Sequence, residues 1–268
     1  MFGTKDVSIN RLKAVLDRQL SVDSLEAMCL AINPKLRSYT QLESIAFGID
    51  SSVFLRLAKH KKREDILDYL RTKHSAPLIL PGQAVQEYWK NQHSVISTKS
   101  KEIKKIFAQL KLEVEGLDSG FESYASEMES LLNRFDDEYG YMYDSSTNRH
   151  ILSLLDMLKE KASLSYVPRM RFSDIAINRK RTKTPPGFKD DGDGDFFIWA
   201  DFLYGLLIAK EAGLQFDRVV LLTNDTKIDW GLMGTAHPVL VAEIQALFGV
   251  PFDVWTAEQL GDAITRNP

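Results

Sequence analysis

Short apolar runs separated by helical segments constrain the fold of this chain more than any other feature. Residues 45–50 read Ile-Ala-Phe-Gly-Ile-Asp, and residues 218–225 read Arg-Val-Val-Leu-Leu-Thr-Asn-Asp. Such runs of apolar β-formers, ended by polar turn residues, predict buried strands. Residues 77–81 and 252–256 predict two further strands. Because helical patterns lie between these strands, the sequence predicts an α/β fold with a central parallel sheet.

Composition limits the class of protein. At 268 residues, 44% of them hydrophobic, the chain suffices for one large domain or two small ones with a sizeable core. Its net charge is −3, so nucleic-acid binding would require a local basic patch. The single cysteine, Cys29, excludes an internal disulfide framework and fits a reducing compartment, which predicts a cytoplasmic protein. No apolar run approaches the roughly 18 residues of a membrane span, and no signal-peptide core is present, so no membrane partner is expected.

Two short helices are predicted ahead of the main fold. Residues 8–20 and 24–32 carry apolar residues at helical spacing, and the second helix ends before Pro34. A DNA-binding helix-turn-helix is an alternative interpretation of this pair, but neither helix has a basic recognition face. We therefore expect residues 1–44 to form an N-terminal helical extension and residues 45–268 to form the main domain.

A helical insertion is predicted within that domain. From Trp89 to Phe135 the seam positions advance in alternating steps of four and three, as in a long helix packed in coiled-coil fashion. Residues 147–164 provide a second apolar stripe, so residues 90–165 are predicted to form an antiparallel helical hairpin. Such an arm is expected to pack on itself. Homodimerisation, or binding of a regulatory protein through the arm, is the alternative.

Four acids are candidates for a metal site. Asp50, Glu87, Asp195 and Asp225 each lie near the carboxyl end of a predicted strand or at the start of the helix after it. In a parallel sheet these ends share one edge, where the four carboxylates can converge. Converging carboxylates repel one another unless a cation neutralises them, and their hard oxygens favour Mg²⁺ or Mn²⁺ over zinc. With a substrate phosphate bound, such a site supports phosphodiester hydrolysis.

Other acids compete for a place in this site. Asp201 follows Asp195 by six residues and so faces roughly the other side of the helix, which favours Asp195. Asp229 is a candidate for a further ligand or for a supporting role. A calcium loop starting at Asp191 would need glycine at its sixth position and glutamate at its twelfth, and the chain has phenylalanine at both. The remaining acids of this stretch fit a polar turn: Asp190, Asp191 and Asp193.

Residues 166–189 form the local basic patch that nucleic-acid binding requires. We interpret this stretch as a basic loop leading into the candidate site, and expect five of its side chains to contact the phosphates of a substrate. These are Arg179, Lys180, Arg181, Lys183 and Lys189. A solvated loop without a binding role is the alternative.

Several ordered motifs resemble a known family. The motifs are Ile49-Asp50-Ser51-Ser52-Val53; Leu80-Pro81 with Gln83 and Glu87-Tyr88-Trp89; Pro185-Pro186-Gly187-Phe188-Lys189-Asp190 with Gly194-Asp195 and Ile198-Trp199; and Thr223-Asn224-Asp225 with Lys227 and Asp229-Trp230. In this order they resemble the bacterial PIN-like nuclease domains, in the large variant whose long helical insertion separates the first two acids from the last two. The resemblance covers roughly residues 45–257.

The resemblance implies a three-layer α/β/α fold and a metal-dependent endonuclease. In that family four acids bind Mg²⁺ or Mn²⁺, and the enzymes cut RNA or, in some branches, structured DNA. Carried over, the catalytic and metal-binding residues are Asp50, Glu87, Asp195 and Asp225, supported by Ser52, Thr223 and Asn224. Ser52 stands where many members have asparagine. RNA is therefore the favoured substrate and DNA the alternative, with a toxin or defence effector as the expected biological role.

Two alternatives to an active nuclease stay open at this point. One is a catalytically silent PIN-like module that binds RNA or protein through the helical arm. The other is an aspartyl phosphotransferase with Asp50 as its nucleophile. Such sites usually have a second acid two residues later, where this chain has Ser52.

Overall fold

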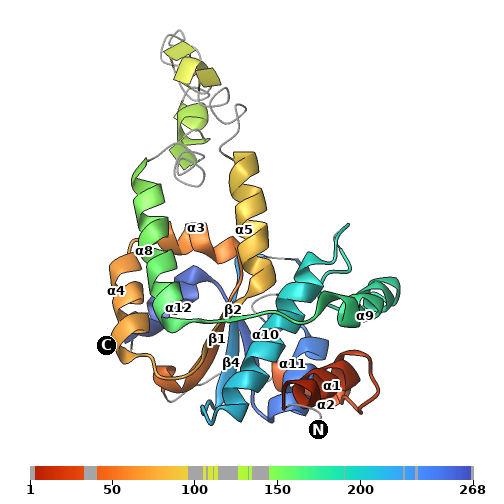
Figure 1. Ribbon diagram of the computed structural model, residues 1–268. Coiled ribbons are helices and arrows are strands. Elements are labelled where there is room, and N and C mark those ends of the chain that lie inside the picture. Colours follow the sequence, from red (N-terminus) through yellow and green to blue (C-terminus); the bar gives the residue numbers. More distant parts are fainter. Residues whose placement is uncertain are drawn as a thin grey trace.

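A five-stranded parallel sheet lies at the centre of the protein (Figure 1). The computed structural model describes residues 4–32, 41–95, 105–106, 108–110, 112–113, 126–131, 133–134, 145–189, 191–225, 227–232 and 235–266. The strand order is β3-β2-β1-β4-β7, and every neighbouring pair is parallel. The strands are β1 (Ile45–Ile49), β2 (Leu78–Pro81), β3 (Ser163–Ser165), β4 (Arg218–Leu222) and β7 (Phe252–Trp255). The predicted α/β fold with a central parallel sheet is confirmed.

Helices cover both faces of the sheet. One layer contains α1 (Thr4–Leu16), α2 (Ser24–Ile32), α9 (Arg169–Arg181), α10 (Gly194–Glu211) and α11 (Pro238–Phe248). The other contains α3 (Ser52–Lys59), α4 (Arg63–Asp68), the π-helical turn η3 (Tyr69–Lys73), α8 (Ser145–Lys161) and α12 (Ala257–Arg266). Helix α5 (Gly82–Val95) follows β2 directly, the 3₁₀ turn η2 (Leu42–Ser44) precedes β1, and a small antiparallel hairpin comprises β5 (Gly231–Leu232) and β6 (Thr235–Ala236).

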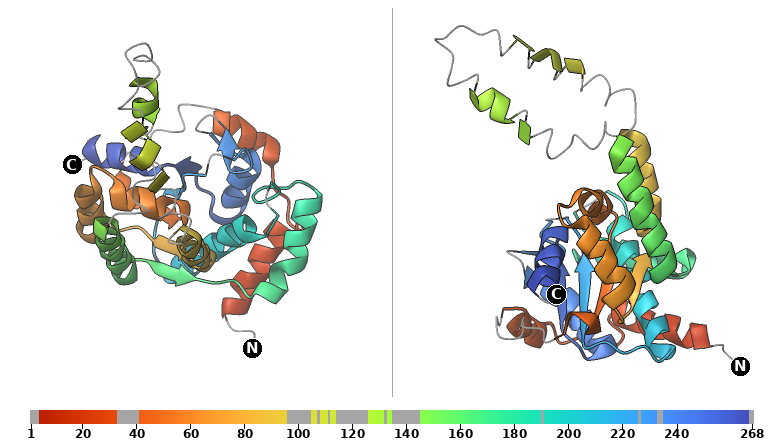
Figure 2. Two further views of the ribbon diagram at one scale, coloured as in Figure 1. Left: turned by 90° about the horizontal axis from the view of Figure 1, so that it is seen from above. Right: turned by 90° about the vertical axis from the view of Figure 1, so that its left-hand side faces the viewer.

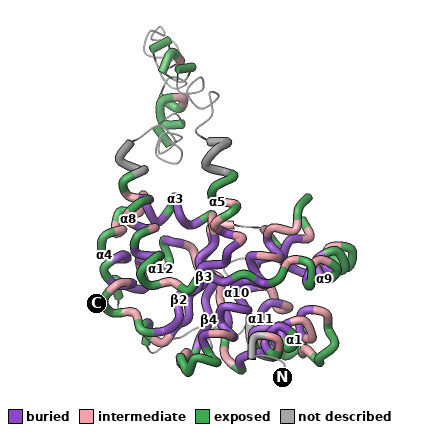
Figure 3. The backbone as a smooth tube through the Cα atoms, in the orientation of Figure 1, coloured by how far each residue is buried: buried purple, intermediate pink, exposed green. Residues whose placement is uncertain are grey.

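Alternate strand residues fill two separate cores. Ala46 and Val219 pack in the core beneath α10, whereas Phe47 and Val220 pack in the core beneath α3 and α12. The strands are therefore buried on both faces, which explains their continuous apolar sequences. Figure 3 shows this burial along the strands and along α10.

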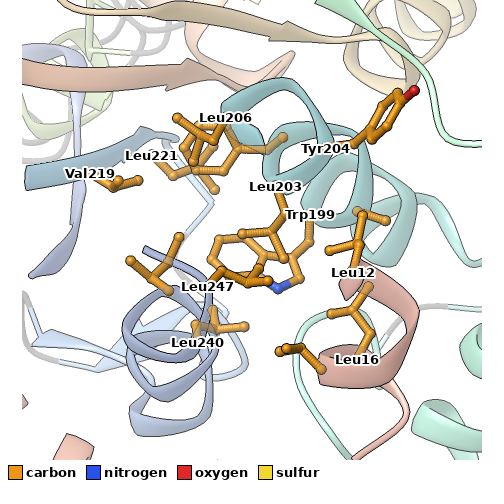
Figure 4. Close-up of a cluster of buried hydrophobic side chains, with 14 of the residues drawn as sticks. Leu12, Leu16, Trp199, Leu203, Tyr204, Leu206, Val219, Leu221, Leu240 and Leu247 are labelled. Atoms are coloured by element: carbon orange, nitrogen blue, oxygen red, sulfur yellow. The ribbon is translucent and has the colours of Figure 1, made fainter. Parts of the chain in front are cut away.

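Helix α10 packs directly on the sheet because two glycines allow a close approach. A Cβ atom added at Gly48 would lie 2.5 Å from the ring of Phe202, and one added at Gly205 would lie 2.5 Å from Ile79. Figure 4 shows Trp199 of α10 in the same core as Leu240 of α11 and side chains of α1 and β4. This packing fixes the direction of α10, whose first turn carries Asp195.

The N-terminal helices belong to the same hydrophobic core. Leu12 and Leu16 of α1 are fully buried beside α10, and α2 packs on α11. The boundary between an N-terminal extension and the main domain at residues 44 and 45 stays a prediction. Within the described residues, no helix is long and apolar enough to cross a membrane.

One expectation about the middle of the chain is wrong. Residues 166–189 do not form a loop, because α9 occupies most of this basic stretch and buries Phe172, Ile175 and Ala176 at helical spacing. In α8, Leu154 and Leu158 lie in the core shared with α3, and the packing of this apolar stripe against a long partner helix stays a prediction. Helix α5 leads away from the body and α8 leads back (Figures 1 and 2). The predicted helix from Trp89 to Phe135 falls largely outside the described residues.

Candidate active site

Asp50 lies immediately after β1, and hydroxyl groups fix its carboxylate. Its Oδ2 accepts hydrogen bonds from Ser52 Oγ at 2.6 Å and from Thr223 Oγ1 at 2.7 Å, and Ser51 Oγ lies 3.3 Å from Oδ1. Asp50 is 5% exposed. Because Thr223 directly follows β4, these bonds join the carboxyl ends of the two central strands. The chain turns in opposite directions from β1 and β4, and such a switch point is where α/β folds bind ligands.

The same hydroxyls connect Asp50 to the backbone that carries Asp225. Ser52 Oγ accepts the Asn224 N–H at 2.9 Å, and Thr223 Oγ1 accepts the Asp225 N–H at 3.0 Å. The Asn224 side chain points to α12, where its Oδ1 accepts the Ala257 N–H at 3.4 Å. Ser52 and Thr223 therefore lie between the two acids, whereas the Asn224 side chain supports the loop from the α12 side.

Asp195 and Asp225 share one cation, the ammonium of Lys227. Lys227 Nζ lies 3.1 Å from Asp195 Oδ2 and 2.8 Å from Asp225 Oδ2. Asp195 stands in the first turn of α10, and Asp225 stands in the loop after β4. Residues 30 positions apart in the sequence thus meet at one edge of the sheet. The arrangement provides two carboxylates whose charge one ammonium offsets only in part.

Glu87 lies beside the start of α10. Its Oε1 accepts a hydrogen bond from Gln83 Nε2 at 3.1 Å, one turn earlier on α5. The same Oε1 is the atom that a Cβ added at Gly194 would strike. Glu87 therefore contacts the backbone directly before Asp195, at a helix N-terminus, where exposed amides favour a negative charge.

Asp201 belongs to a separate network. It is fully buried, and its carboxylate accepts two 2.8 Å hydrogen bonds from Arg169, together with the backbone N–H of Gln83 at 2.9 Å and of Val167 at 2.8 Å. These bonds give the Asp201 carboxylate a structural role. They also hold the first turn of α5, one turn before Glu87.

Asp229 supports the loop that packs against Asp195. It is fully buried, and its Oδ2 accepts the Gly187 N–H at 2.9 Å. Gly187 has a positive φ of 89°, and a Cβ added there would lie 3.3 Å from the Cβ of Asp195. Of the two roles expected for Asp229, this position fits the supporting one.

Arg179 does not face solvent, so its expected contact with substrate phosphates is wrong. It is 3% exposed and donates to Glu243 at 2.7 and 3.3 Å, to the Leu16 carbonyl and to the Pro185 carbonyl. Glu243 also accepts the indole N–H of Trp199 at 2.7 Å. A buried charge needs such partners. Arg179 therefore joins α9 to α10 and α11 and has a structural role.

The other four basic residues lie on or after the end of α9. Lys180 Nζ donates to the Asp191 carbonyl, in the turn before α10, and thereby joins α9 to the start of the candidate site. Arg181, Lys183 and Lys189 are exposed. These three side chains stay candidates for contacts with phosphates.

Sequence reasoning named Ser52 and Thr223 as supporting residues but assigned no role to three others that contact acids, Lys227, Gln83 and Arg169. Lys227 stands two residues after Asp225, and this spacing does not indicate where the Lys227 side chain lies. Gln83 stands one helical turn before Glu87, which is a local signal for the bond between them. The partnership of Arg169 with Asp201 has no local signal, because 32 residues separate them.

The carboxylates of the candidate site meet some of the requirements of a divalent metal ion. Among the residues that the structure describes, no three or more His, Cys, Asp or Glu side chains form a group arranged to hold a metal ion. The donors have the right chemistry, since carboxylate oxygens are the ligands of Mg²⁺ and Mn²⁺. The pair Asp195 and Asp225 also accommodates a cation, because the Lys227 ammonium lies between them. The site thus suits a cation at this pair.

Comparison with known families gives one match. A family model described as a PIN-like domain matches residues 46–139 and 111–238, which together span residues 46–238 and include all four candidate acids. Comparisons with curated proteins and with solved structures give no significant match.

Proposed function

Because the chain belongs to the PIN-like domain family, we propose that it is a metal-dependent endonuclease that hydrolyses phosphodiester bonds in RNA. PIN-like domains are generally nucleases, and their fold implies nucleic-acid binding. The observation that supports the proposal most strongly is the pair formed by Asp195 and Asp225. Two carboxylates from distant segments share a positive charge at the edge where Asp50 is also fixed.

Asp50, Glu87, Asp195 and Asp225 are the proposed ligands of Mg²⁺ or Mn²⁺. A bound divalent cation would neutralise these carboxylates, polarise a substrate phosphate and lower the pKa of a coordinated water. The chain's own residues organise the ligands. Ser52 and Thr223 fix the Asp50 carboxylate, and Gln83 donates to Glu87. Held in this way, the acids need little rearrangement when substrate arrives.

The exposed basic residues are the proposed contacts for the substrate backbone. Arg181, Lys183 and Lys189 lie in the segment that leads from α9 to the first turn of α10. Lys180 bonds to the carbonyl of Asp191 within this segment. Phosphate contacts of this kind position a nucleic acid without reading its sequence. We favour RNA over DNA, and a cytoplasmic site of action.

A catalytically silent module is the second candidate function. The observation that favours it is the Lys227 ammonium, which occupies the position between Asp195 and Asp225. In that case α5 and α8, which leave the body together, would serve as the route to a protein partner or to a second copy of the chain (Figure 2).

Hydrolysis of labelled single-stranded RNA and DNA separates the two candidates. The wild type is compared with Asp50→Asn and Asp225→Asn in Mg²⁺ and in Mn²⁺, with the exposed Asp174→Asn on α9 as the matched control. We expect wild type and control to cut RNA, and the two site variants to lose activity by about a hundredfold or more. Equal activity in all four proteins, or none in any metal, would contradict the nuclease proposal.

A further inference from the structure

We propose that Lys227 is a built-in competitor of the divalent cation, and that its ammonium must leave the Asp195 and Asp225 pair for the metal to bind there. The inference rests on the proposed function, because it concerns the same metal site. It adds a residue that sets the affinity of that site for metal.

The position of the ammonium supports competition. Lys227 Nζ lies 3.1 Å from Asp195 Oδ2 and 2.8 Å from Asp225 Oδ2, so it bridges the two carboxylates. The side chains of Asp195 and Asp225 are only 10% and 18% exposed. Carboxylates so far removed from water repel one another unless a positive charge lies close to both. An ammonium in that position offsets half of the negative charge that a divalent metal ion would offset in full.

The Lys227 side chain can leave while its backbone stays in place. The Lys227 N–H donates to Asp225 Oδ1 at 2.9 Å, and the Lys227 carbonyl accepts the Trp230 N–H at 3.1 Å. Trp230 is buried, with its ring 6.3 Å from that of Trp199. The turn is therefore anchored in the core. The Lys227 side chain itself is 35% exposed, and a flexible four-carbon stem allows its ammonium to rotate into water.

Competition has two consequences of opposite sign. Without metal, Lys227 stabilises the folded protein by offsetting part of the repulsion between the two carboxylates. With metal, the apparent affinity for the metal is lower, because part of the binding free energy is used to break the ion pairs of Lys227 with Asp195 and Asp225. A lysine with only a structural role would produce the first effect without the second.

Calorimetric titration with Mn²⁺ and thermal unfolding with and without Mn²⁺ test this difference. The proteins are the wild type, Lys227→Met, Lys227→Arg and Lys62→Met. Lys62 is the matched control, since its ammonium lies 3.0 Å from Asp262 and its side chain is 36% exposed, away from the four acids. We expect Lys227→Met to unfold at a lower temperature without metal, to bind Mn²⁺ about tenfold more tightly or better, and to gain more stability from it. Lys227→Arg and Lys62→Met should bind Mn²⁺ no more tightly than the wild type.

A second measurement uses the wild type alone, and so remains decisive if Lys227→Met fails to fold. Lysine amines are labelled with an acylating reagent, with and without Mn²⁺, and each site is quantified by mass spectrometry. Displacement predicts that Mn²⁺ increases labelling of Lys227 and leaves Lys62 unchanged. Unchanged or reduced labelling of Lys227 in the presence of bound Mn²⁺ would overturn the inference.

The outcomes separate this inference from the proposed function. If Lys227→Met binds Mn²⁺ as the wild type does, or more weakly, Lys227 does not compete, while the metal site itself stands. If neither protein binds Mn²⁺ at millimolar concentration, both the competition and the metal-dependent function are wrong.

Discussion

Arg169 holds Asp201 through two hydrogen bonds of 2.8 Å, so of the two aspartates on α10 only Asp195 is left to face Lys227. The Asp201 carboxylate also accepts two backbone N–H groups and is fully buried. Its negative charge is therefore matched within the fold. Asp195, six residues earlier, stands at the sheet edge with Asp225.

Arg169→Met should destabilise the protein. Removing the guanidinium leaves the buried Asp201 carboxylate without its countercharge, which we expect to lower the free energy of unfolding by about 2–4 kcal/mol. Arg171→Met is the control, because Arg171 pairs with Asp6 at the surface and such pairs contribute only about 0–1 kcal/mol. Urea unfolding measures both. Similar losses of unfolding free energy in the two variants would show that Arg169 is not needed to stabilise the buried Asp201 carboxylate.

Gly194→Ala should reduce activity with little loss of stability. A methyl group at Gly194 collides with Oε1 of Glu87, so the carboxylate has to shift. A displacement of about 1 Å at a catalytic group can cost about a hundredfold in rate. Gly192→Ala is the matched control, since the nearest atom to its Cβ is 4.0 Å away. The measurement is RNA cleavage in Mn²⁺, with thermal unfolding as the check on folding. Full activity of Gly194→Ala would show that the position of the Glu87 carboxylate does not matter for cleavage.

Exposed and buried basic residues should behave differently. Changing Arg181, Lys183 and Lys189 to glutamine should weaken RNA binding and reduce the slope of log affinity against log salt by about 0.7 per lost phosphate contact. Arg179→Gln should instead destabilise the protein, because the buried Glu243 loses the guanidinium that donates to both of its carboxylate oxygens, although Arg18 and Trp199 still contact it. Fluorescence anisotropy across a salt series measures the binding. An unchanged slope in the triple variant would place the substrate elsewhere.

Acid should destabilise the protein through His74. Burial lowers the pKa of His74 from 6.5 to about 4, despite the opposing influence of Glu43. The unfolded chain therefore binds a proton that the folded protein does not between these two pH values. The contribution of neutral His74 to the free energy of unfolding is fully present above about pH 6.5. It decreases by about 2–3 kcal/mol as the pH falls to about 4.

His74→Gln tests that pH dependence. Unfolding free energies from pH 7 to pH 4 should decrease less steeply in this variant than in the wild type, with His150→Gln as the control. Burial also lowers the pKa of His237, so some acid sensitivity should remain. The same steepness in His74→Gln and wild type would show that His74 is not responsible.

The central strands and the edge that carries the acids are predictable from sequence, because β1 and β4 are buried on both faces and so read as continuous apolar runs. Strand β3 is not, since Ser163–Ser165 has two exposed residues and is defined by its pairing with β2. Helix α9 is also hard to predict, because Arg179 interrupts the pattern of apolar residues on its buried face. This charge occupies an interior position, matched by Glu243 64 residues away.

The acids are easier to predict than the contacts between them. Parallel strands bring Asp50 and Asp225 to one edge whatever the side-chain details. The direction of Lys227, in contrast, depends on a turn anchored by the buried Asp229 and Trp230. Tertiary contacts of this kind have no counterpart in residue spacing.

The most direct test of the central claim is a crystal structure of the protein soaked in Mn²⁺, with the metal located by its anomalous scattering. We predict Mn²⁺ within about 2.5 Å of carboxylate oxygens of Asp195 and Asp225, with Asp50 or Glu87 completing the site and Lys227 turned away. Mn²⁺ bound elsewhere, or no Mn²⁺ at this edge of the sheet with the Lys227 ammonium still between the two aspartates, would contradict the account.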